Sequence, residues 1–174
     1  DIDPCKIGLL AGLLNSPLDV ARIAAREKVL GGQDNIEIVG TVEGAYDRDK
    51  SLTAISNLLQ ANMDINGILS NADQQTMGAQ IALENAGIDP ASIYLTGGGG
   101  TTEAVKAVRE GKWTNDYLNY PVTMGEAALE QLSNQLLGEK VEPVVDADTL
   151  VDINPMATKE DLDAMPDFTG EWNG

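Results

Sequence analysis

Residues 67–82 read GILSNADQQTMGAQIA, a stretch that joins a short apolar strand to an amphipathic helix. Gly67–Leu69 is the kind of nearly continuous apolar run that is buried on both faces of a parallel sheet. Asp73 is placed to cap the helix that follows, and Met77 and Ile81 put apolar side chains on one helical face. The stretch therefore predicts one strand-loop-helix unit of an α/β fold.

The same unit recurs along the chain. Four further apolar runs are candidate strands: Lys6–Ala11, Ile36–Thr41, Ser92–Thr96 and Asp116–Asn119. Segments with helical periodicity lie between them, and the first begins at a serine cap followed by proline, Ser16-Pro17. Strands that alternate with helices through short loops predict a three-layer α/β fold, a parallel sheet with helices on both faces.

The length of 174 residues allows one compact domain, or one lobe of a larger protein. We expect residues 1–153 to form the α/β lobe and residues 154–174 to form an acidic, solvated C-terminal tail with one short helix at Lys159–Met165. Glu142–Asp152 is a candidate for one more extended segment.

Charge and composition exclude several classes of function. The 28 acidic and 11 basic residues leave a net charge of −17, which repels nucleic-acid phosphates and anionic lipid surfaces. The longest apolar run, Ile7–Leu14, is too short to insert into a bilayer. The chain has no histidine and a single cysteine, Cys5, which removes histidine relays and thiolate–imidazole metal sites. We therefore expect no catalytic residue, metal or cofactor.

The loops that follow the strands are the candidate binding site, because ligands of open parallel sheets bind at the carboxyl ends of the strands. Five loops qualify: residues 13–16, 44–47, 70–73, 97–100 and 119–121. They and the adjacent Arg22 offer mostly amides and hydroxyls, one or two carboxylates, one guanidinium and aromatic rings. This set suits a small, neutral, polyhydroxylated ligand and contains no nucleophile–base pair, so we expect a binding protein and not an enzyme.

The glycine run Gly97–Gly100 has two readings. Bare backbone amides before a helix attract phosphate, which keeps a flavodoxin-like or nucleotide-binding domain open as an alternative. The run lacks the G-x-G-x-x-G context, however, and also fits a tight turn or a close approach to a ligand. Tyr46 is likewise either a stacking platform or a loop anchor.

Taken in order, these loops resemble the second lobe of the sugar-binding proteins of bacterial ABC importers, the ribose-binding-like group. Ile68–Ala79 resembles the family pattern A-x-N-D-x-x-A-x-G-A, and Thr96–Val108 resembles its G-x-D-G turn and helix. Arg22 lies in the place of a family D-R-x-x-G, Tyr46 starts an aromatic-D-R motif, and Pro121–Val141 ends in G-E-K-V. The resemblance covers about 140 residues.

The resemblance implies roles for individual residues. Arg22 would donate to ligand hydroxyls, Tyr46 would stack on the sugar ring, and Asn119 would supply an amide contact. Asp73 would lie at or beside the ligand. The full set of candidate ligand-binding residues is Asn15, Arg22, Tyr46, Asn71, Asp73, Gly98, Gly99 and Asn119.

Two positions depart from the family pattern. Ala72 stands where relatives carry a ligand-binding asparagine, a role that Asn71 can take over. Gly99 stands where many carry a sugar-binding aspartate. The ligand is therefore expected to be a modified sugar or another small polar molecule.

Family members have two lobes, so the resemblance also implies partners. The helix Met124–Leu137 would pack on an N-terminal lobe that is absent from this chain, or on a second chain, through Leu129, Leu132 and Leu136. It further implies export to the periplasm or cell exterior, with the signal peptide removed, and delivery of ligand to an ABC permease. The alternative within the same fold is the effector-binding domain of a lac-repressor-type transcriptional regulator.

Overall fold

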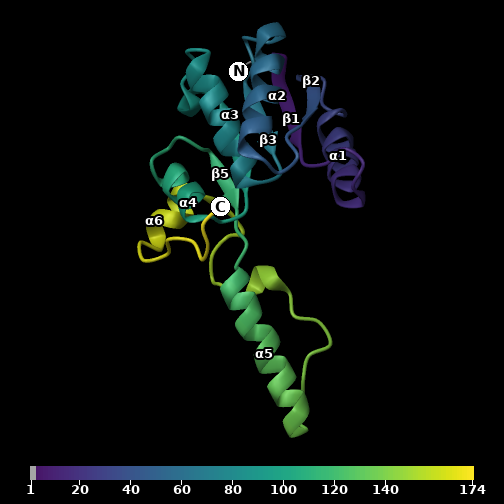
Figure 1. The fold of residues 1–174 in the computed structure, drawn as a ribbon, viewed down its shortest axis with the longest axis vertical. Coiled ribbons are helices and arrows are strands. Elements are labelled where there is room, and N and C mark those ends of the chain that lie inside the picture. Colours follow the sequence, from purple (N-terminus) through teal and green to yellow (C-terminus); the bar gives the residue numbers. More distant parts are fainter. Residues whose placement is uncertain (1–2) are drawn as a thin grey trace.

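A six-stranded β-sheet with helices on both faces is built from residues 3–174, the part of the chain that the computed structural model describes (Figure 1). The strands are β1 (Cys5–Ala11), β2 (Ile36–Glu43), β3 (Gly67–Ser70), β4 (Tyr94–Gly98), β5 (Asn115–Tyr117) and β6 (Met156–Thr158). The α-helices are α1 (Pro17–Leu30), α2 (Arg48–Ala61), α3 (Asp73–Asn85), α4 (Thr102–Arg109), α5 (Pro121–Leu137) and α6 (Lys159–Ala164). The predicted α/β class is confirmed.

The strand order is β2-β1-β3-β4-β5-β6, and the first five strands are parallel. Their carboxyl ends therefore share one edge of the sheet. The chain runs from β1 outward to β2 and then crosses back to β3, so the loops after β1 and β3 leave the sheet in opposite directions. Such a reversal of strand order opens a crevice at the carboxyl edge, where ligands of open α/β sheets bind.

The two faces of the sheet are covered unequally. Helices α2 and α3 pack together on the face that receives Leu10 and Ile68, which join the main hydrophobic core. A side chain at Gly8 would collide with Leu58 of α2 at 2.8 Å, which explains the glycine in a buried strand. Because right-handed crossovers in opposite directions lie on opposite faces, α1 covers the other face, as Figure 1 shows.

The expectation of a solvated C-terminal tail is corrected. Strand β6 pairs antiparallel with β5, which makes the sheet mixed, and Ala157 and Leu162 are completely buried. Arg109 of α4 donates to the carbonyl oxygens of Leu162 (3.1 Å) and Met165 (2.8 Å), which fixes α6 against the body. A few apolar residues among acidic ones are enough to order this segment, because β6 pairs with the otherwise unpaired edge of β5. The predicted short helix is confirmed.

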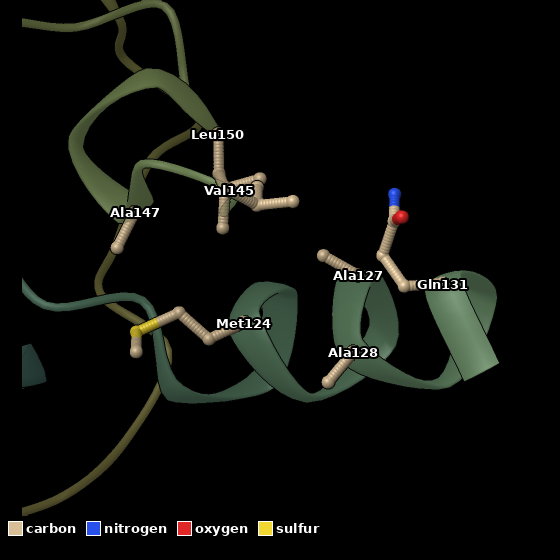
Figure 2. A pocket seen from close by; sticks show the side chains of 7 residues that line it. All are labelled: Met124, Ala127, Ala128, Gln131, Val145, Ala147 and Leu150. Carbon is tan, nitrogen blue, oxygen red and sulfur yellow. The ribbon is translucent and has the colours of Figure 1, made fainter. Parts of the chain in front are cut away.

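The segment expected to be extended between residues 142 and 152 contains no strand; it forms a 3₁₀ turn at Ala147–Thr149. It runs back along α5, which extends away from the sheet (Figure 1). Figure 2 shows side chains of α5 and of residues 145–150 around a small cavity of about 160 Å³. Helix α5 and residues 145–150 therefore pack against each other and together project from the sheet.

No residue of α5 is buried. The expected apolar stripe is largely exposed, with Leu129 at 68%, Leu132 at 53% and Leu136 at 79%. The stripe has no cover within residues 3–174. Among the helices of this part of the chain, none combines the length and apolar character needed to cross a membrane.

Candidate ligand-binding cleft

A cavity of about 700 Å³ lies between α1 and the strands β3 to β5. Four of the predicted binding residues line it: Arg22, Asn71, Gly98 and Asn119. They come from the first helix and from the loops or strand ends of β3, β4 and β5, so the folded sheet brings together residues that are far apart in the sequence. The cavity continues over the sheet face, where its lining becomes apolar.

The other predicted residues lie around this cavity without lining it. Tyr46 is connected to it through hydrogen bonds, Gly99 is part of the loop after β4, and Asp73 lies behind that loop. Asn15 is exposed on the loop after β1 and does not line the cavity.

A carboxylate that the sequence analysis did not single out, Asp19, organises one side of the cleft. It is completely buried near the start of α1. Its donors are the backbone N–H groups of Gly12 (3.1 Å) and Leu13 (2.8 Å), the hydroxyls of Ser16 (2.7 Å) and Tyr46 (2.9 Å), and the side-chain amide of Asn71. It thus joins the loops after β1, β2 and β3 in one network.

These hydrogen bonds determine the charge of Asp19. Burial by itself raises the pKa of this carboxyl, but the bonds from Leu13, Ser16, Tyr46 and Gly12 outweigh burial and hold the pKa at about 2. Asp19 is therefore ionised at neutral pH. The sequence signal was an acid three residues after Ser16, which reads as an ordinary helix-capping pattern and does not reveal the contacts to distant loops.

Tyr46 is held in an unusual backbone conformation. Ala45 and Tyr46 have φ values of 52° and 55°, in the left-handed region that non-glycine residues rarely adopt. The ring lies against Gly12, where a β-carbon would come within 2.1 Å of it. The hydroxyl is anchored on Asp19 while 36% of the residue stays exposed. Tyr46 is thus a loop anchor that still presents surface for stacking.

The glycine run of residues 97–100 wraps around two buried carboxylates. Asp73 accepts from the backbone N–H groups of Gly98 and Thr101, both at 2.8 Å, and Asp116 of β5 accepts from that of Gly100 at 2.9 Å. A β-carbon on Gly99 would lie 2.6 Å from Asp73. The glycines are therefore required by the close approach of the carboxylates. Because the carboxylates already accept hydrogen bonds from the N–H groups of this loop, the alternative that these groups bind a phosphate is disfavoured.

Asp73 also differs from its predicted role as a helix cap. Ala72 occupies the N-cap position of α3, and no side chain caps the helix there. Instead, both carboxylate oxygens of Asp73 accept hydrogen bonds from the loop after β4, so Asp73 stabilises the loop that borders the cleft.

Asp116 is completely buried, and its Oδ1 has no hydrogen-bond partner. Burial raises the pKa of this carboxyl well above its ordinary value, and the charge of Asp73 and a hydrogen bond to it raise the pKa further. The protonated form of Asp116 is therefore favoured. Among residues 3–174 no group of acidic or cysteine side chains is arranged to hold a metal ion.

Comparison with known proteins agrees with this arrangement. The profile described as "Periplasmic binding protein domain" matches residues 2–140. The ribose import binding protein of Salmonella typhimurium is 32% identical over 124 residues, covering 68% of this chain and 41% of that protein. The D-allose-binding periplasmic protein of Escherichia coli is 26% identical, covering 80% of this chain and 44% of that protein.

Solved structures show the same fold. An ABC transporter solute-binding protein from Mycobacterium smegmatis, with bound glycerol, has a TM-score of 0.76 at 27% identity, covering 98% of this chain and 56% of the other. One from Actinobacillus succinogenes, with bound D-allose, has a TM-score of 0.73 at 26% identity, covering 82% and 51%. The chain thus spans about half the length of these proteins or less. By its sequence and its fold, the chain belongs to the periplasmic binding protein family.

Proposed function

We propose that this chain is the ligand-binding lobe of a solute-binding protein that takes up a sugar-like, hydroxylated molecule and presents it to an ABC permease. The observation that carries the proposal is the convergence of Arg22, Asn71, Gly98 and Asn119 on one cavity at the carboxyl edge of the sheet. Related proteins with the same fold are named for ribose and D-allose. The family is one of solute-binding proteins and not of enzymes.

The proposed mechanism is closure of two lobes around the ligand. In this mechanism, one lobe supplies one wall of the site. A second lobe, from the same polypeptide or another chain, would cover the exposed stripe of α5 formed by Leu129, Leu132 and Leu136. Contacts made only in the closed state would then supply the differential affinity that drives closure. We place the protein in the periplasm or at the cell exterior, as its relatives' names indicate.

The test is a titration of the ¹⁵N-labelled chain with D-ribose and D-allose, and separately with ATP and FMN, followed by NMR. The proposal expects the sugars to shift the backbone signals of Asn71, Gly98 and Asn119. Arg22→Gln should weaken these shifts, and Arg48→Gln, at an exposed position outside the cavity, should not. Shifts of residues 97–101 with nucleotides, and none with sugars, would contradict the proposal.

A further inference from the structure

The charge of the cleft is opposite to that of the chain. The cavity between α1 and β3 to β5 is lined by two arginines, Arg22 and Arg26, and by no aspartate or glutamate. In the whole chain, acidic residues outnumber basic ones by 28 to 11. The lining of this cavity therefore collects two positive charges and no acidic side chain.

The two arginines are not neutralised by the protein. They lie on successive turns of α1, where like charges repel. None of the ion pairs of residues 3–174 includes either of them. Burial, and after it the charge of Arg22, lower the pKa of Arg26, and the charge of Asp19 offsets this only in part.

The nearby carboxylates are already occupied. Asp19 accepts five hydrogen bonds from other groups, which exceeds the roughly four lone-pair sites of a carboxylate. Asp73 and Asp116 lie behind the glycine run, bonded to its N–H groups and to each other. None of the three offers an oxygen to a guanidinium group in the cavity.

No side chain reaches the cavity from the middle of the glycine run. A β-carbon on Gly99 would collide with Asp73 at 2.6 Å. Arg26 is directed to the carboxyl edge of the sheet by hydrogen bonds to the carbonyl oxygens of Leu69 (3.3 Å) and Ser70 (2.8 Å). The remaining polar lining near that edge consists of neutral amides and hydroxyls, which suit ligand hydroxyl groups.

We propose that the ligand is a hydroxylated carboxylate, a sugar acid, whose carboxylate is bound by Arg22 beside the positive charge of Arg26. The fork of a guanidinium group matches the two oxygens of a carboxylate, and such charge-assisted bonds are stronger than those to a neutral hydroxyl. The inference rests on the proposed function, deepens it, and replaces the expectation of a neutral ligand.

The experiment uses pairs of ligands that differ only at one carbon. The ¹⁵N-labelled chain is titrated with D-galactose and D-galacturonate, and with D-glucose and D-glucuronate, at concentrations up to about 100 mM so that millimolar affinities are measured. D-Ribose serves as a further neutral ligand, and D-galactose 6-phosphate separates a carboxylate site from a general anion site. We expect at least one uronate to bind about tenfold or more tighter than its neutral partner.

Three variants assign the effect to the arginines. Arg22→Gln should lower the affinity for the acid much more than the affinity for the neutral sugar, so that most of the preference for the acid is lost, and Arg22→Lys should retain part of the preference. Arg48→Gln is the matched control and should leave both affinities unchanged. Because Arg22 is partly exposed, these variants should keep the signal dispersion of the parent spectrum, which verifies that they are folded.

The outcomes separate the inference from the proposed function. Neutral sugars that bind as tightly as their acids would overturn the inference and leave the proposed function standing. Stronger binding of the sugar phosphate than of the uronate would also overturn the carboxylate assignment. If no compound shifts the signals of Asn71, Gly98 or Asn119, both the inference and the proposed function of this chain fail.

Discussion

Two groups of buried carboxylates flank the cleft, and they differ in how the free-energy cost of burying a negative charge is avoided. Asp19 is surrounded by five donors, which hold its pKa at about 2. Asp116 receives one backbone N–H and lies against Asp73, and its Oδ1 is without a partner. The first carboxylate is charged and fully hydrogen-bonded, whereas burial and the neighbouring Asp73 favour the protonated form of the second.

The difference shows that the number of donors, and not burial alone, decides the charge of a buried carboxyl group. It also separates two tasks. The Asp19 network joins three loops and positions Tyr46 and Asn71 at the cleft. The Asp73–Asp116 pair instead occupies the space beneath residues 97–100 and shapes the loop that borders the same cleft.

Removing the Asp19 carboxylate should have the largest effect. Asp19→Ala leaves buried donors on Gly12, Tyr46 and Asn71 without a partner, and we expect a loss of about 3–5 kcal/mol in the free energy of unfolding, measured with urea. Asp47→Ala is the matched control, because Asp47 is an exposed helix cap bonded only to the Lys50 N–H, and it should cost about 1 kcal/mol. Equal losses in the two variants would show that Asp19 is no more than a cap.

Adding a side chain to the glycine loop that packs on Asp73 and Asp116 should have the next largest effect. Gly99→Ala places a β-carbon 2.6 Å from Asp73, and we expect a loss of about 1–3 kcal/mol through displacement of the carboxylate or the loop. The control is Gly125→Ala in α5, where no atom lies within 4 Å of the new carbon and a slight gain in stability is expected. The close packing of the loop is refuted if both substitutions are tolerated.

Asp116→Asn tests the raised pKa of Asp116. The folded pKa of Asp116 is raised above 3.8, so the folded chain holds a proton that the unfolded chain releases, and stability falls as the pH rises above about 4. The variant should match the parent within about 1 kcal/mol at pH 4 and become progressively more stable relative to it toward pH 8.

Urea unfolding of both proteins across this pH range measures the effect. Asp19 contributes in the opposite sense, because its stabilisation is lost as the pH falls from about 4 to about 2, and it does not interfere above pH 5. Parallel pH profiles for parent and variant would mean that the pKa of Asp116 is not raised in the folded chain.

Tyr46→Phe should have the smallest effect. It removes one hydroxyl donor from Asp19 and leaves four, so we expect a loss of about 1 kcal/mol in the free energy of unfolding. If the exposed ring stacks on the ligand, Tyr46→Phe should keep the ligand affinity within about twofold, whereas Tyr46→Ala should lower it clearly. Equal affinities in the two variants would restrict Tyr46 to its anchoring role.

Most of the fold could be predicted because its signals are local. Apolar runs, caps such as Ser16 and the alternation of strands and helices identified five strands, each with both bounds within two residues of those observed. The sixth strand was missed. Met156–Thr158 has only three residues, and its pairing depends on the free edge of β5 and not on any pattern of its own.

The candidate site could be predicted in part. Arg22, Asn71, Gly98 and Asn119 were found because the carboxyl ends of parallel strands must meet at one edge. Whether these residues bind a ligand stays a prediction. The importance of Asp19 could not be seen, because a helix-start acid gives no sign of contacts with the loops after β2 and β3.

The amino-acid sequence alone determined the α/β class, the order of the loops and the resemblance to sugar-binding lobes, since each follows from short-range patterns along the chain. Only the tertiary structure decided which carboxylates are charged, which glycines are obligatory and which charges remain in the cavity. The reason is physical: hydrogen-bond satisfaction, steric exclusion and desolvation depend on neighbours in space, and here those neighbours come from different strands of the sheet.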